Sequence, residues 1–340
     1  MDTYRKVEYF DILNALACLC VIGMHCNGIV HEFDGSAAWA QSMVVETLAY
    51  WAVPVFFMLS GATMMNYRER YSTKEYFKRR WKKAGIPFLF WTIVIGIAQY
   101  ISGNMKWSGI KGLVEQFLNC QFEPVYWFFI PLFMIYLCMP VLTKLYTDRK
   151  VLWYLVGMGV FFEGILPFLH SWQIIAYNSD FRFPMTSGYI LYPILGYLIH
   201  TTEIPPKYRK CIYILGGWGA FFRYTYTYLA SFRDGTLNQL TWGYLNWPSL
   251  LLSVAIFVFI KYAGAYIRAD KLKRGISKLA RASFGVYLIH VLIMEAIITI
   301  FKINVYDAWW RFLGAFIVYG VSWLIVRVLQ KMPGGNYILP

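Results

Sequence analysis

The apolar run from residue 9 to residue 29 carries a carboxylate, an amide and an imidazole that could do chemistry together: Asp11, Asn14 and His25. Ionisable groups in a membrane-length run are costly, so they usually face a protein interior or a water-filled cavity and mark a functional site. On a helix, Asp11 and His25 would lie roughly 21 Å apart along the axis. That distance covers most of a hydrocarbon core of about 30 Å. The first helix is therefore predicted to carry the chemistry.

The spacing of these residues predicts one polar stripe on that helix. Asn14 follows Asp11 by three residues, and His25 follows Asn14 by eleven residues, about three turns. Of the three groups, only an imidazole titrates near neutral pH in free solution, which suits a general base. The alternative is a histidine that only forms a hydrogen bond inside a helix bundle, and the spacing favours neither reading.

The composition identifies the broad class of the protein. The chain has 340 residues, of which 59% are hydrophobic, 20% are aromatic and only 15% are charged, whereas about a quarter of a soluble domain is charged. Apolar runs of about 20 residues recur along the chain, as in transmembrane helices, and a β-barrel would instead show short alternating segments. We therefore expect an all-α, polytopic transmembrane helix bundle that forms a single domain over residues 1–340.

The distribution of basic residues predicts the orientation in the bilayer. Lys and Arg concentrate in the loops of one side, above all at residues 68–83 and 268–281, which places both termini in the cytoplasm. Because the net charge of +14 comes largely from these short loops, it indicates a lipid bilayer as partner and no nucleic acid. We predict about ten spans, at 9–30, 44–66, 84–102, 124–145, 151–169, 184–200, 211–230, 245–263, 283–301 and 308–329.

Two further segments carry groups that could act with the first helix. Ser60 precedes Gly61, which indicates either close helix packing or a hydroxyl that faces a cavity. The basic cluster at residues 78–83 either contacts anionic headgroups or binds the phosphates of a cofactor. The six cysteines show no metal-ligand spacing, so no metal is expected. Cys26 and Cys120 are both expected at the outer face of the membrane, where a disulfide between them is an open alternative.

Six short motifs occur in an order typical of one family, and together they extend over nearly the whole chain. They are residues 10–17 (FDILNALA) with His25, 53–61 (VPVFFMLSG), 80–83 (RWKK) before Ile86-Pro87, 126–129 (YWFF) with Tyr136-Leu137 and Pro140, 188–189 with 195–197, and 283–290 (SFGVYLIH). In these motifs the chain resembles the acyltransferase-3 family of bacterial integral-membrane O-acyltransferases, of the type that O-acetylates enterobacterial common antigen and other glycans.

The resemblance implies an activity, substrates and a location. An acyl group, usually acetyl, would pass from cytoplasmic acyl-CoA (acetyl-CoA) to a hydroxyl of an extracytoplasmic glycan or glycolipid, in the bacterial plasma membrane. His25 matches the histidine proposed as the base in the family. The family has Arg at the position of Asn14, so this chain lacks that positive charge. The resemblance places Arg80 in a basic pair in which Lys83 replaces a second Arg.

These observations give two candidate sets of site residues. The catalytic set is His25, Asn14, Asp11 and Ser60, and the set for the acyl donor is Arg79, Arg80, Lys83 and Trp127. Three other residues in the apolar runs remain to be placed: Glu163 or Glu295 would orient His25, and His290 is expected to form a structural hydrogen bond. Two other functions remain open, a transporter for a small solute or lipid-linked sugar and a non-catalytic sensor or binding module.

Overall fold

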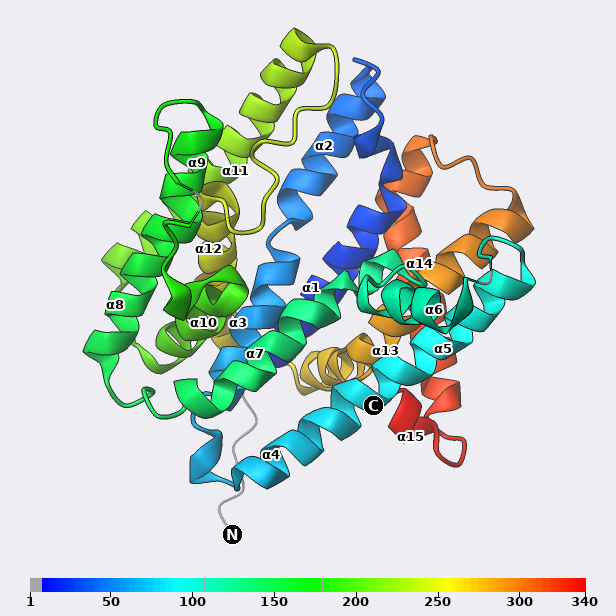
Figure 1. The fold of residues 1–340 in the computed structure, drawn as a ribbon, viewed down its shortest axis with the longest axis horizontal. Helices are drawn as coiled ribbons and strands as arrows, with labels where there is room; N and C mark the ends of the chain where they lie inside the picture. Colours follow the sequence, from blue (N-terminus) through cyan, green and yellow to red (C-terminus); the bar gives the residue numbers. More distant parts are fainter. Residues whose placement is uncertain (1–7, 107, 179) are drawn as a thin grey trace.

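The computed structural model describes residues 8–106, 108–178 and 180–340, and every regular element within these ranges is helical (Figure 1), which confirms the all-α prediction. The first half contains α1 (Glu8–Cys26), η1 (Gly28–His31), α2 (Ala37–Ala49), α3 (Ala52–Met64), η2 (Tyr67–Glu69), α4 (Thr73–Arg80), η3 (Trp81–Gly85), α5 (Ile86–Ile101), α6 (Gly109–Leu118), η4 (Pro124–Phe128), α7 (Phe129–Leu142), α8 (Arg149–Gly159), η5 (Val160–Ile165) and α9 (Leu166–Ser171). The second half contains η6 (Pro184–Thr186), η7 (Gly188–Ile190), α10 (Leu191–Thr201), α11 (Pro206–Asp234), α12 (Trp247–Ala263), η8 (Gly264–Tyr266), α13 (Asp270–Phe301), α14 (Ala308–Leu329) and α15 (Gly335–Ile338).

Eight helical stretches in the described part of the chain are long and apolar enough to cross a membrane, so the protein is a multi-pass helical membrane protein. They are Glu8–Cys26, Ala37–Glu69, Thr73–Ile101, Pro124–Leu142, Arg149–Ser171, Trp247–Tyr266, Asp270–Phe301 and Ala308–Leu329. The other two predicted spans correspond to α10 and α11. With 11 residues, α10 is only about 16 Å long, and α11 is long enough but less apolar. The total of ten spans therefore stays a prediction.

Helix α1 packs against α13, α14 and α3 inside the bundle. Its buried face carries Leu13, Ala17 and Val21, whose small or compact side chains allow neighbouring helices to approach on several sides. Two side chains of α1 donate to backbone carbonyls of α13: the Asn14 side-chain amide to that of Ala280 (3.1 Å), and the Cys18 thiol to that of Ser283 (3.3 Å). The orientation of α1 about its own axis, and so the direction of its polar side chains, is fixed by α13.

Two glycines let α3 and α10 pack backbone to backbone. A Cβ on Gly61 would lie 1.8 Å from the carbonyl oxygen of Pro193, and a Cβ on Gly196 would lie 2.0 Å from that of Met58. Neither position can accept a side chain without separating the helices, as is typical of small residues at membrane-helix interfaces. Gly61 therefore takes part in close helix packing, one of the two alternatives for this segment, and Ser60 lines a cavity, which is the other.

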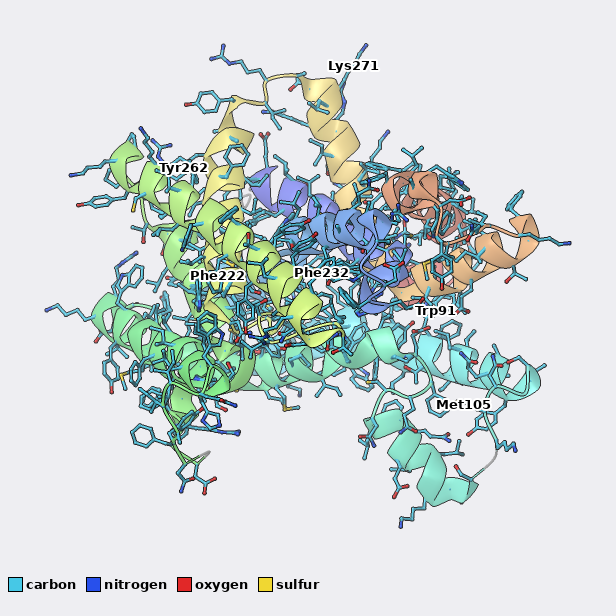
Figure 2. The ribbon with its side chains drawn as sticks, turned by 90° about the horizontal axis from the view of Figure 1, so that it is seen from above. Trp91, Met105, Phe222, Phe232, Tyr262 and Lys271 are labelled. Carbon is cyan, nitrogen blue, oxygen red and sulfur yellow. The ribbon has the colours of Figure 1, made fainter. Side chains whose placement is uncertain are left out.

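The peripheral connections lie far from this core. Figure 2 shows Met105, near the connection between α5 and α6, and Lys271, at the start of α13, at opposite edges of the molecule.

All six cysteines are free thiols, so the disulfide considered for Cys26 and Cys120 is absent. The Cys26 thiol instead lies 3.8 Å from the sulfur of Met294 on α13.

Candidate active site

His25 lines a cavity of about 190 Å³. The residue lies near the C-terminal end of α1, just before η1. We call this space the His25 cavity; its lining residues are Val21, Met24, His25, His31, Glu46, Tyr50, Val53, Val125, Trp127, Phe128, Trp242, Tyr244 and Tyr287. His25 itself is partly buried, whereas His31 is exposed, so the cavity reaches the surface of the protein at His31. Partial burial lowers the pKa of His31, which favours an uncharged rim at neutral pH.

A second imidazole packs against His25. The ring centroids of His25 and His290 are 5.2 Å apart, and His290 is fully buried. Nδ1 of His290 lies 2.6 Å from the carbonyl oxygen of Tyr287; because a carbonyl only accepts, this nitrogen carries the proton. The expected structural hydrogen bond of His290 is thus present. The same residue also forms one wall of the environment of His25, which the sequence did not indicate.

The Asn14 cavity, of about 160 Å³, adjoins the His25 cavity on the other side of two aromatic rings. It is lined by Asn14, Phe56, Ser60, Phe128, Leu132, Tyr136, Ser283, Phe284 and Tyr287. Phe128 and Tyr287 line both cavities, and their ring centroids are 5.6 Å apart. Asn14 and His25 therefore line two different cavities that share two aromatic walls. Their spacing of eleven residues places them on nearly the same face of α1.

Two polar side chains of the Asn14 cavity already donate hydrogen bonds to backbone carbonyls. The Ser60 hydroxyl donates to the carbonyl of Phe56 on its own helix (3.0 Å). One N–H of the Asn14 amide is used by Ala280, and an amide has a second N–H. Asn14 also lies roughly 16 Å along the axis from His25. Asn14 and His25 therefore line different cavities, too far apart to contact the same small group.

Among the basic residues predicted to bind the donor, Arg80 contacts a residue that lines the Asn14 cavity. Its guanidinium carbon is 5.7 Å from the ring centroid of Tyr136, which lines the Asn14 cavity. Arg79 instead forms an exposed ion pair with Glu75 (2.9 Å) and lies over Tyr71. Lys83 is exposed. Among the contacts of these three basic residues in the described part of the chain, that of Arg80 alone reaches a residue of either cavity.

A local break in the helix follows Arg80. Residues Trp81–Gly85 form a π-helical turn in which the Ile86 N–H bonds to the carbonyl of Trp81. Pro87 comes next, and because its ring nitrogen cannot donate to the carbonyl four residues earlier, the α-helical pattern is interrupted there. The widened turn changes the direction in which Arg80 and Lys83 project relative to a regular helix.

Asp11 is not brought together with His25. It lines a separate cavity of about 400 Å³, the Asp11 cavity, formed by Glu8, Asp11, Ile12, Gly264, Ile267, Lys273, Arg274, Ile276, Ser277, Lys278 and Arg281. None of these described residues lines the other two cavities. Glu8 pairs with Lys273 (2.9 Å) across this space. Asp11 and Asn14 are three residues apart, so their side chains point in directions that differ by about 60° around the axis of α1. This difference is enough to direct Asp11 towards the start of α13.

Trp127, predicted with the donor residues, lines the His25 cavity instead. It begins a column of aromatic rings: Trp127 stacks on Tyr244 with centroids 5.6 Å apart, and Tyr244 stacks on Tyr50 at 4.1 Å. The guanidinium of Arg223 lies 3.5 Å from the centroid of the Tyr50 ring. The column therefore ends on a buried cation.

Sequence reasoning missed Glu46, the carboxylate that lines the His25 cavity. Glu163 and Glu295, which were considered as partners of His25, line neither the His25 cavity nor the Asn14 cavity among the described residues. Glu163 lies in the π-helical segment η5, and Glu295 is exposed on α13. A signal for Glu46 was present, because it is an ionisable residue inside an apolar run.

Fold and site together define a multi-pass membrane protein with two adjoining cavities inside its helix bundle, lined by polar and aromatic residues. The chain belongs to the acyltransferase-3 family, since the family model described as "Acyltransferase domain" matches residues 7–327. No curated protein and no solved structure matches the chain significantly. Membership of this family indicates a membrane acyltransferase.

Proposed function

We propose that this protein is an O-acyltransferase of the bacterial plasma membrane, with both termini in the cytoplasm. It moves an acyl group, acetyl in the simplest case, from cytoplasmic acyl-CoA to a hydroxyl of an extracytoplasmic glycan or glycolipid. The observation that carries the proposal is the pair of adjoining cavities. They share Phe128 and Tyr287 and lie between Arg80, next to Tyr136, and the exposed rim at His31.

The donor enters from the side of Arg80. A guanidinium binds phosphate through paired N–H groups, and the exposed Lys83 adds positive charge close to it in the chain. The pantetheine arm is long and narrow and would extend along the Asn14 cavity towards the two shared rings. The remaining N–H of Asn14 is available to a carbonyl of that arm, so Asn14 acts as a positioning residue for the donor.

The chemistry takes place in the His25 cavity. His25 accepts the proton of the acceptor hydroxyl, the hydroxyl oxygen forms a bond to the thioester carbonyl carbon, and the carbon–sulfur bond breaks. The CoA thiolate then takes the proton from His25, so the imidazole returns to its starting state. General-base catalysis of this kind contributes typically about 10²–10⁴-fold.

The oxyanion formed in this step needs an N–H donor. Two indoles line the His25 cavity, and that of Trp242 already donates to the Thr227 hydroxyl (3.3 Å). No acceptor for the indole N–H of Trp127 is present among the described residues, so Trp127 is the available donor. This assignment moves Trp127 from donor binding to the reacting centre.

The test uses the purified full chain in lipid nanodiscs with radiolabelled acetyl-CoA and an envelope glycan extract from cells that lack the gene. Wild type is expected to label the extract, and His25→Gln is expected to lose label incorporation by at least 10²-fold, with an unchanged thermal melting profile. Wild-type turnover in folded His25→Gln would remove His25 from the mechanism. In sealed proteoliposomes made with the same protein, solute uptake without any CoA dependence would favour the transporter, and no reaction or uptake would favour the sensor.

A further inference from the structure

The Asp11 cavity has no part in the proposed reaction. Its volume of about 400 Å³ falls within the range of about 300–1,000 Å³ that is typical of small-molecule sites. The start of α1, η8 and the start of α13 meet there. Gly264 in η8 allows this approach, because a Cβ at that position would lie 3.0 Å from Cδ1 of Ile12 on α1. The cavity is therefore formed by segments that are far apart in the sequence, and it is large enough to hold a ligand.

Three positively charged side chains line this cavity from one face of α13. Arg274, Lys278 and Arg281 are four and three residues apart, so they project from the same side of the helix. None of the ion pairs in the described part of the chain includes any of the three. The lining contains four basic and two acidic side chains, which leaves a net charge of +2. An anion therefore complements the cavity.

Phosphate is the anion that these side chains favour. A guanidinium donates paired N–H groups to two phosphate oxygens, and an ammonium adds a point charge. Two sources of a phosphate group can reach the end of a helix bundle: a soluble molecule such as CoA, and the headgroup of a phospholipid. The rest of the lining distinguishes between them.

The remaining wall of the cavity is apolar and continues along α1. Ile12, Ile267 and Ile276 line the cavity. Leu16 lies one turn after Ile12 on the same face of α1 and is 39% exposed. A soluble phosphate compound would leave this stripe uncovered, whereas an acyl chain would cover it. Arg281 is also the last basic residue of α13 before a long apolar stretch, which is where the phosphates of a bilayer are expected.

We propose that the Asp11 cavity binds one phospholipid with a negatively charged headgroup, such as phosphatidylglycerol. The phosphate lies among the side chains of Arg274, Lys278 and Arg281, and one acyl chain lies along Ile12 and Leu16. This second site is separate from the reacting centre. The proposal therefore does not depend on the proposed acyl transfer.

The bound lipid would stabilise the contact that orients α1. Asn14 and Cys18 donate to carbonyls of α13 further along the two helices, and the Asp11 cavity lies near the start of both. A phosphate held by α13 and a chain packed on α1 would restrain the rotation of α1 about its axis. Because the site requires the folded arrangement of both helices, the lipid is expected to raise the melting temperature.

The test measures the melting temperature of the purified full chain in a neutral detergent, without acyl donor or acceptor. Dioctanoyl phosphatidylglycerol is titrated into wild type, Lys278→Gln/Arg281→Gln and the control Lys207→Gln/Lys210→Gln, which removes two exposed charges at the start of α11, outside the cavity. Wild type and control should show the same saturable stabilisation. The cavity variant should need about tenfold or more lipid for the half-maximal shift, because two cations near the phosphate are lost. An equal lipid dependence of all three proteins would overturn the proposal.

Three further ligands test the source and the charge of the phosphate group. Glycerophosphoglycerol, the same headgroup without acyl chains, should not stabilise wild type at the concentrations at which the lipid does, and dioctanoyl phosphatidylcholine should be the weaker lipid. Any stabilisation by CoA should be the same in wild type and in the cavity variant. Equal stabilisation by glycerophosphoglycerol or by phosphatidylcholine, or a CoA effect that Lys278→Gln/Arg281→Gln abolishes, would refute the phospholipid site.

The two proposals can fail independently. Saturable binding of phosphatidylglycerol that depends on Lys278 and Arg281, without any acyl transfer in the nanodisc assay, would support the lipid site and end only the proposed function. Acyl transfer by wild type together with an equal lipid response of the cavity variant would end only the lipid site.

Discussion

His25 packs against His290 with ring centroids 5.2 Å apart and ring planes inclined by 41°. The hydrogen bond from Nδ1 of His290 to the carbonyl of Tyr287 fixes the ring that forms this contact. In many hydrolytic and transfer enzymes a carboxylate orients the catalytic histidine. Here the buried His290 ring packs against His25, and the carboxylate residue that lines the same cavity is Glu46.

Replacing His290 tests this supporting role. In His290→Ala the carbonyl of Tyr287 loses its donor and a buried ring is removed, so we expect a loss of stability of roughly 1–3 kcal/mol, measured by thermal unfolding in nanodiscs. The rate of acyl transfer should decrease because less protein is folded and because His25, without the ring that packs against it, is more mobile. His25→Ala is the comparison, because it should abolish transfer with little change in melting temperature. A fully stable His290→Ala would contradict the structural role.

Arg80 and Arg79 are neighbours with different expected effects on the donor. Arg80→Gln removes the cation next to Tyr136 at the Asn14 cavity, so apparent KM for acetyl-CoA should rise about tenfold or more, as expected for loss of a charge-assisted phosphate contact. Arg79→Gln only breaks the exposed pair with Glu75 and should change KM less than twofold. Equal effects of the two variants would show that the donor contacts the exposed face of α4 instead.

Gly61 and Gly196 should not tolerate a methyl group. Gly61→Ala places a Cβ 1.8 Å from the carbonyl oxygen of Pro193, and relief requires α3 and α10 to separate. Overpacking costs about 1–3 kcal/mol or more, so the yield of folded protein and its melting temperature should fall. Gly217→Ala in α11 is the control, because a Cβ there meets no atom within 4 Å, and it should fold as wild type or better.

Glu123 predicts a pH dependence of stability. It lies just before η4 and is 6% exposed; burial raises its pKa to about 7, the Val125 N–H opposes the shift, and Glu295 adds to it. Between about pH 4.5 and pH 7 the folded state then holds a proton that the unfolded chain has released, so stability decreases as pH rises through this window.

The measurement for Glu123 is the melting temperature of wild type and Glu123→Gln between pH 5 and pH 8. The variant cannot ionise, so its advantage over wild type should grow with pH and level off above about pH 7. A difference that stays constant over the range would show that Glu123 has an ordinary pKa in the folded protein.

Several features followed from the sequence because they depend on local properties. Apolar run length and charge depletion determined the helical membrane class, and a period of eleven residues placed Asn14 and His25 on one face of α1. Gly61 next to Ser60 indicated close helix packing, and the six ordered motifs indicated the family. Each of these conclusions depends either on residues that are close in the sequence or on the composition of the whole chain.

The partners of His25 were decided by the tertiary structure alone. Glu46, Tyr244 and His290 come from α2, the segment before α12, and α13, and nothing in the sequence shows which side chains of separate helices face one another. Rotation of a helix by a fraction of a turn exchanges the residues that face a cavity, and packing against every neighbouring helix sets that rotation. For the same reason Asp11 faces its own cavity, while Trp127 faces that of His25.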